Sequence, residues 1–164
     1  VLVSPPAHLN LHEYVKVFID QASESGVEEV VNISSFGLHP TEHPLRIVEE
    51  YLQASRMNVT ILRPNSYMQY FGTYFRQMIV DENAIRLPAK ESKSSFIDLR
   101  DVAEATSRIL TSPSLKGKAS IQLTGPKSLN MFEIAEIFST ILERKIYYIQ
   151  ISEEEYRAQL TLEG

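Results

Sequence analysis

The chain has 164 residues, of which 43% are hydrophobic and 23% are charged, and its formal net charge is −5. This composition is typical of one globular domain with its own core, and the absence of cysteine excludes disulfides and thiolate catalysis. The Lys and Arg residues are scattered, which disfavours nucleic acid as a partner, and no apolar run is long enough to span a bilayer. We therefore expect a cytoplasmic protein that binds neither a membrane nor nucleic acid.

The first part of the chain alternates between strand and helix patterns. Apolar runs and apolar helix faces predict strand, helix, strand, helix and strand over residues 1–3, 11–22, 30–34, 44–55 and 59–63. Strands joined by helices in this way are parallel, with right-handed crossovers. The sequence therefore predicts an α/β fold, a partial doubly wound parallel sheet.

After Pro64 the pattern changes. We expect a helix over 68–81 and short strands over 84–87, 95–98 and 145–151. Three pairs of residues have the spacing of an N-cap and a carboxylate that completes a capping box: Asp101 with Glu104, Asn130 with Glu133, and Ser152 with Glu155. Each pair predicts the beginning of a helix.

The turns that follow the predicted strands are candidates for ligand binding. In a doubly wound sheet, ligands bind beyond the carboxyl ends of the strands, and small or polar turns let a flat ligand approach the backbone. The candidate residues in these turns are Ser4, Pro5, Pro6, Ser34, Ser35, Pro64, Asn65, Ser66 and Tyr67. The alternative is that such residues only end the strands, and their position does not decide between the two interpretations.

Two motifs of nucleotide-dependent enzymes are absent from the sequence. The six glycines are too far apart for a GxGxxG turn or a Walker loop, so a dinucleotide's pyrophosphate would have to bind upstream of Val1. None of the eight tyrosines has a lysine four residues later. No catalytic residue is assigned, and a proton for hydride chemistry would have to come from water, the substrate or an unusual donor.

The four histidines form two pairs with i, i+4 spacing, His8 with His12 and His39 with His43. This spacing can hold a metal on one helix face, but prolines flank the second pair and the first begins ahead of its helix. We therefore expect no metal site. His43 is a candidate proton donor, although a solvated loop histidine is the favoured interpretation.

Asp98 and Asp101 could pass for a pair of catalytic acids. We interpret them structurally instead: Asp101 as a helix N-cap, and Asp98 as a partner for an arginine such as Arg63 or Arg100.

Six segments together resemble one protein family. They are EVVNISS (29–35), EEYLQAS (49–55), TILRPN (60–65) with Met68 and Gln69, FIDLRDVA (96–103), LTGP (123–126) and ISEEEY (151–156). In their order and spacing the chain resembles the NmrA-like branch of atypical short-chain dehydrogenases/reductases, a group of NAD(P)-binding oxidoreductases and redox-sensing regulators. The resemblance implies a Rossmann sheet, NADP or NAD as cofactor, and truncation of the chain at its N-terminus.

The resemblance also assigns roles to parts of the chain. Residues 1–66 would be the C-terminal half of the dinucleotide-binding sheet, and residues 67–164 would supply its remaining elements and a smaller substrate-covering lobe, as one continuous unit. Residues 4–6 and 34–35 would line the nicotinamide side of the cleft, and residues 64–67 would pack against the ring. Relatives often have a histidine four residues before the glutamate that matches Glu49, where this chain has Leu45.

Three functions remain open at this point. The first is an NAD(P)-dependent oxidoreductase-like domain that transfers hydride to a small carbonyl or quinone acceptor, as a monomer or homodimer. The second is a non-catalytic NAD(P)-sensing regulator that acts on a partner protein, and the missing proton relay favours it. The third is an inactive truncated fragment whose exposed sheet edge pairs with another chain.

Overall fold

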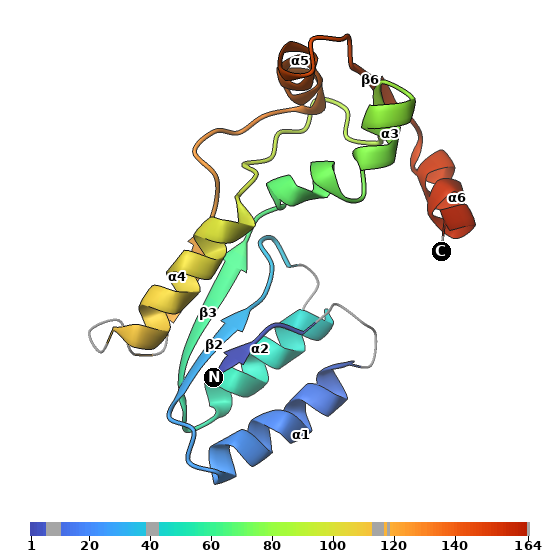
Figure 1. Ribbon diagram of the computed structural model, residues 1–164. Helices are drawn as coiled ribbons and strands as arrows, with labels where there is room; N and C mark the ends of the chain where they lie inside the picture. Colours follow the sequence, from blue (N-terminus) through green and yellow to red (C-terminus); the bar gives the residue numbers. More distant parts are fainter. Residues whose placement is uncertain (6–10, 39–42, 113–116, 118, 164) are drawn as a thin grey trace. The chain divides into compact units, whose positions relative to one another are not determined.

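A computed structural model describes residues 1–5, 11–38, 43–112, 117 and 119–163 (Figure 1). The chain divides into two compact units. We call the first, residues 1–65 and 97–124, the sheet unit, and the second, residues 66–96 and 125–164, the lobe unit. The chain therefore leaves the sheet unit after Asn65 and returns to it at Ile97.

The sheet unit is built on four parallel strands. They are β1 (Leu2–Val3), β2 (Glu29–Ile33), β3 (Asn58–Pro64) and β5 (Ala119–Leu123), in the spatial order β1-β2-β3-β5. The predicted parallel order of the first three strands is confirmed. Strand β5 was not predicted, because four of its five side chains are exposed and its sequence lacks the apolar run of a buried strand.

Helices cover both faces of this sheet (Figure 1). Helices α1 (Leu11–Glu24) and α2 (Pro44–Ala54) lie on one face, and α4 (Leu99–Thr111) lies on the other. Neighbouring residues of β2 show the division: Val30 packs in the core with Ile19 of α1, whereas Val31 packs with Ile109 of α4. Side chains alternate along a strand, so a strand covered on both faces is apolar on consecutive residues, as Val30 and Val31 are.

Helix α1 ends at Glu24, two residues beyond the predicted range of 11–22. Gly26 has a φ of +81°, a conformation that glycine adopts without steric cost. The amide of Val27 donates to the carbonyl of Ala22 at 3.0 Å, which closes the last turn of the helix.

The lobe unit combines short helices with a two-stranded parallel sheet. Its elements are the 3₁₀ helix η1 (Met68–Gly72), α3 (Arg76–Asp81), β4 (Ala84–Leu87), α5 (Met131–Ile141), β6 (Tyr147–Gln150) and α6 (Glu153–Glu163). Strands β4 and β6 pair with each other. Phe71, Ile85, Phe96, Ile134 and Ile146 are buried in one core cluster.

Two predicted elements of this region are wrong. The helix expected over 68–81 is interrupted at Thr73, whose φ and ψ of −122° and −90° are not helical. Gly72 and Thr73 both favour helix weakly, and together they separate η1 from α3. The strand expected over 95–98 does not form; Ser94 makes an isolated bridge to Leu129 instead.

The capping boxes at Asn130 and Ser152 are confirmed. Oδ1 of Asn130 accepts from the amide of Glu133 at 2.9 Å, and Oγ of Ser152 accepts from the amide of Glu155 at 3.1 Å. The N-cap expected at Asp101 is wrong. Asp98 is the N-cap of α4, and its side chain accepts a hydrogen bond from the amide of Arg100 at 2.8 Å. The helix therefore begins at Leu99, three residues before the start that a cap at Asp101 would give.

Candidate functional site

The carboxyl ends of β1, β2 and β3 lie side by side. Val3 is beside Asn32 in the β1–β2 register, and Ile33 is beside Leu62 in the β2–β3 register. Because all three strands are parallel, the turns that begin at Ser4, at Ser34 and after Pro64 leave the sheet at the same edge, which we call the carboxyl rim. The predicted convergence of these turns therefore follows from the sheet topology.

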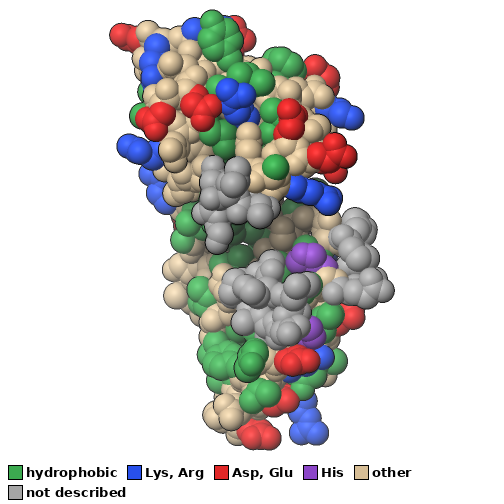
Figure 2. All heavy atoms as spheres, turned by 90° about the vertical axis from the view of Figure 1, so that its right-hand side faces the viewer, with side chains coloured by type: hydrophobic (Ala, Val, Ile, Leu, Met, Phe, Trp, Pro, Cys, Tyr) green, Lys and Arg blue, Asp and Glu red, His purple; other side chains and the backbone are tan. Residues whose placement is uncertain are grey.

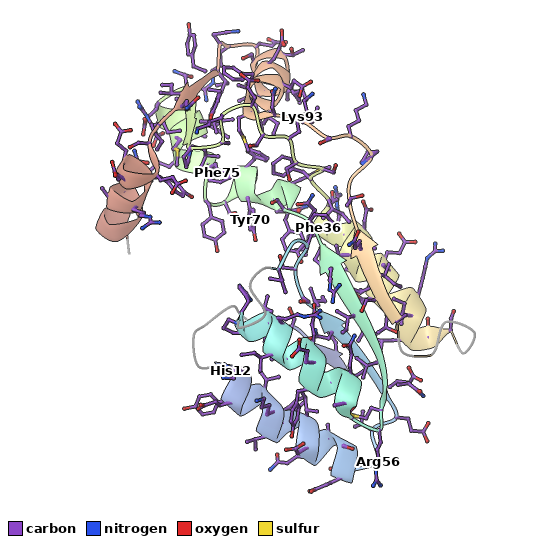
Figure 3. All side chains as sticks on the ribbon, turned by 180° about the vertical axis from the view of Figure 1, so that it is seen from behind. His12, Phe36, Arg56, Tyr70, Phe75 and Lys93 are labelled. Carbon is purple, nitrogen blue, oxygen red and sulfur yellow. The ribbon has the colours of Figure 1, made fainter. Side chains whose placement is uncertain are left out.

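Backbone hydrogen bonds fix the second and third turns against each other. The amide of Ser34 donates to the carbonyl of Leu62 at 2.8 Å, and the amide of Phe36 donates to the carbonyl of Pro64 at 2.9 Å. The hydrogen-bond ladder thus continues beyond β2. Figure 3 shows Phe36 at this end of the sheet unit and Arg56 at the opposite end.

The candidate residues divide between the two units. Ser4, Pro5, Ser34, Ser35, Pro64 and Asn65 belong to the sheet unit, whereas Ser66 and Tyr67 begin the lobe unit. Ser4 is exposed, Ser34 is buried and Ser35 is half-buried. Pro6 lies outside the described residues. The sheet unit by itself therefore brings together the residues of three turns.

A buried carboxylate lies next to the second turn. Glu49 of α2 has no exposed surface, and it accepts from Nε and Nη2 of Arg63 on β3 at 2.9 and 2.5 Å. Nη1 of Arg46 donates to the same carboxylate at 2.8 Å. One acid thus holds two arginines, and its bidentate bond to Arg63 ties α2 to the last part of β3.

The charge of Glu49 is stabilised in place. Burial alone raises the pKa of this carboxyl, but hydrogen bonds from Arg63, Ser34 and Arg46 outweigh burial and leave the pKa below its ordinary value. The buried Ser34 hydroxyl therefore lies near the carboxylate and contributes to this lowering. Glu49 is therefore ionised at neutral pH, and it connects the arginines to the carboxyl rim.

The role of Glu49 was not predicted, although the sequence contains a signal for it. Leu45, Val48, Glu49 and Leu52 are the buried residues of α2, so the carboxylate occupies a core position of an apolar helix face. A charged residue at such a position is almost never left unpaired. The pairing suggested between Asp98 and Arg63 is not found; Asp98 pairs with Arg100 at 2.6 Å.

A second buried polar group lies one residue before the end of β2. Asn32 is fully buried, and neither its side-chain oxygen nor its side-chain nitrogen has a hydrogen-bond partner within the described part of the chain. Asn32 and Ser34 point to the same face of the sheet, because side chains alternate along a strand. Asn32 is therefore a buried polar group near the end of β2 whose hydrogen bonds no described residue satisfies.

His43 has a structural role at the beginning of α2. It is the N-cap of α2, where its Nδ1 accepts from the amide of Leu45 at 3.2 Å. Among the described residues no group of three His, Asp or Glu side chains could hold a metal ion; His8 and His39 lie outside these residues.

Tyr67 is the only tyrosine among the candidate residues. Burial and, to a smaller degree, the neighbouring Tyr70 raise the pKa of its hydroxyl above the ordinary value. The phenol therefore keeps its proton at neutral pH. An acid of this kind lacks the activation that a nearby lysine would give it.

Other surfaces of the described residues fit a ligand less well. A depression of about 690 Å³ is lined by Asp20, Glu24, Glu28, Arg56 and Asn58, and it lies at the amino ends of β2 and β3, opposite the carboxyl rim. On the face drawn in Figure 2, basic side chains lie among acidic ones, with no continuous basic surface. None of the described helices is both long enough and apolar enough to cross a membrane.

Comparison with known proteins identifies relatives over almost the whole chain. The model of the NmrA-like family matches residues 15–162. Agroclavine dehydrogenase of Claviceps fusiformis is 33% identical over 99% of this chain and 57% of its own length. NAD(P)H azoreductase of Xenophilus azovorans is 30% identical over 87% of this chain and 51% of its own length. The chain therefore spans about half the length of the curated relatives it matches.

Solved structures with the same fold include two reductases. Triphenylmethane reductase of Citrobacter sp. in complex with NADP(H) superposes with a TM-score of 0.82 at 19% identity, over 99% of this chain and 59% of that chain. The NADPH-dependent quinone oxidoreductase QOR2 of Escherichia coli in complex with NADPH gives a TM-score of 0.85 at 18% identity, with the same coverage. At this level of identity the likeness shows the fold, and it confirms the predicted α/β class.

Proposed function

Because the chain belongs to the NmrA-like family, we propose that it forms the nicotinamide side of an NAD(P)-dependent oxidoreductase that reduces a small carbonyl or quinone acceptor. The observation that carries this proposal is the convergence of three turns at one rim of a parallel sheet. This rim is where nucleotides bind in doubly wound sheets. The substrate-covering role of the lobe unit is part of the same proposal.

The residues at the rim suit the nicotinamide end of a dinucleotide. The buried side chain of Asn32 has no hydrogen-bond partner in the described part of the chain, and Ser4 and Ser35 have hydroxyls on the neighbouring turns. A pyrophosphate cradle is not among the residues of this chain, since no two glycines share a turn. The chain thus fits one end of the cofactor, with residues 4–5, 34–35 and 64–67 as its proposed contacts.

When bound, a reduced nicotinamide supplies the hydride, and the protein positions the acceptor and excludes water. The turns at Ser34 and Pro64 are suited to this task because backbone hydrogen bonds hold them together. The Glu49–Arg63 pair fixes α2 to β3 directly below them. None of the described side chains at the rim is an activated acid, so the proton that balances the reduction is supplied by water.

Direct titration with NADPH and NADH tests the proposal. The chain contains no Trp, so the fluorescence of the reduced nicotinamide is measured with little protein background. We expect Ser35→Glu to weaken binding by about tenfold, because it places a negative charge next to an anionic ligand. Ser25→Glu is the matched control at the far end of α1, and it should leave binding unchanged. Equal effects of the two substitutions would place the nucleotide elsewhere.

A non-catalytic NAD(P) sensor is the second candidate. It is favoured by the missing Tyr-x-x-x-Lys motif and by the raised pKa of Tyr67, which leave the rim without an activated acid. Steady-state oxidation of NADPH with a panel of quinones and aldehydes separates the two functions. A protein that binds NADPH and turns over none of these acceptors is the sensor.

A further inference from the structure

The aromatic residues at the beginning of the lobe unit divide into two groups. Phe71 is buried in the core cluster of this unit, and Phe75 packs against the same cluster. Tyr67, Tyr70 and Tyr74 are not part of the cluster, and Tyr74 is 75% exposed. Figure 3 labels one residue of each group, Tyr70 on η1 and Phe75 ahead of α3. The phenylalanines therefore stabilise the core, and the tyrosines contribute little to it.

The three tyrosine rings contact one another in chain order, and we call them the tyrosine row. The ring centroids of Tyr67 and Tyr70 are 5.8 Å apart with an interplanar angle of 76°, and those of Tyr70 and Tyr74 are 5.3 Å apart with an angle of 65°. Both pairs are edge-to-face, an arrangement that the ring quadrupole favours. In such a pair, the ring that supplies its edge keeps both of its faces clear of its partner. The row therefore holds aromatic rings in place without covering all of their faces.

The tyrosine row begins close to the carboxyl rim. Tyr67 follows Pro64 by three residues, so their Cα atoms are at most about 11 Å apart. Tyr67 is also one of the proposed contacts of the nicotinamide. A molecule that binds to the row next to Tyr67 would lie beside the nicotinamide, in the position of the acceptor.

We propose that the tyrosine row binds the acceptor and selects planar aromatic acceptors, such as quinones, over aliphatic carbonyls. This inference rests on the proposed function, because only a bound nicotinamide beside Tyr67 makes a molecule at the row an acceptor. The face of a phenol ring carries negative electrostatic potential, and a quinone ring is poor in electrons, so the two attract when they stack. An aliphatic carbonyl has no ring face, and it gains only contact with apolar surface.

Binding to the full chain without nucleotide is the first test. The probes are menadione, which is a naphthoquinone, and the decalin dione with the same carbon skeleton, so that the two differ in the aromatic plane. The chain has no cysteine, so no thiol adds to the quinone. Titrations followed by the NMR signals of the tyrosine rings give the dissociation constants. We expect menadione to bind about tenfold more tightly than the dione.

Substitutions within the row locate the effect. Tyr70→Leu keeps apolar bulk but removes the ring, and it should weaken menadione binding about tenfold without changing binding of the dione. Tyr70→Phe keeps the ring and should bind menadione as the wild type does. Tyr74→Leu, at the exposed end of the row, should act in the same direction as Tyr70→Leu with little effect on folding. Tyr147→Leu is the matched control, because Tyr147 is a 57% exposed tyrosine of β6 outside the row.

Equal affinity for the two probes, or equal losses in Tyr70→Leu and Tyr147→Leu, would overturn the inference. Circular dichroism checks that every variant folds. Binding of NADPH is measured separately, on the wild type and on Tyr70→Leu. If the row selects menadione but the chain binds no NADPH, the proposed function is rejected and the selectivity of the row stands. If NADPH binds and Tyr70→Leu leaves the preference between the probes unchanged, the proposed function stands and the row has only a structural role.

Discussion

Replacing Glu49 by Gln should destabilise the protein by about 2–3 kcal/mol. The substitution keeps the shape of the side chain but removes the charge that accepts two hydrogen bonds from Arg63 and one from Arg46. A hydrogen bond to a charged group contributes about 1.5–3 kcal/mol, and breaking a buried ion pair costs about 3–5 kcal/mol. The side chains of Arg63 and Arg46 remain 22% and 32% exposed, so water recovers part of this loss.

Urea denaturation followed by circular dichroism measures the change in the free energy of unfolding. Glu50→Gln is the matched control, because Glu50 is adjacent on α2, is 54% exposed and pairs with the same Arg46 at 3.3 Å. An exposed pair of this kind contributes at most about 0.5 kcal/mol. If the two substitutions cost the same, or if Glu49→Gln costs less than about 1 kcal/mol, the argument that the buried carboxylate fixes α2 to β3 is refuted.

Three further outcomes follow from the same contacts. The pKa of Glu49 is lower in the folded protein than in the unfolded chain, so the free energy of unfolding should fall as the pH drops below 4.5. Urea titrations at several pH values measure this loss, which should be smaller in Glu49→Gln. Asn130→Ala removes the N-cap of α5 and should lower the free energy of unfolding by about 1 kcal/mol, whereas Glu136→Ala on the same helix should change it little. Lys90→Gly should raise the melting temperature because Lys90 has a φ of +48°, and Lys127→Gly, without a positive φ, should not.

The sequence alone determined the class of the sheet unit and the edge at which the turns after its strands leave the sheet. Short apolar runs such as Val30 and Val31 alternate with amphipathic helices, and that order admits parallel strands with crossovers and few alternatives. Once the strands are parallel, the turns after Val3, Ile33 and Pro64 must leave at one edge. Local signals were also sufficient for the caps at Asn130 and Ser152, because a capping box involves only residues three apart.

Only the tertiary structure decided the features that depend on distant residues. The sequence of β5 has no apolar run. It forms a strand because it pairs with β3, which lies more than fifty residues earlier in the chain. Both Asp98 and Asp101 have the chemistry of a cap, and packing of the helix that follows decides in favour of Asp98. Glu49 finds Arg63 across the layer between helix and sheet. Sequence periodicity indicates which face of an element is buried, but it carries no information about which residues pack against that face. The pairing of Glu49 with Arg63 depends on that packing.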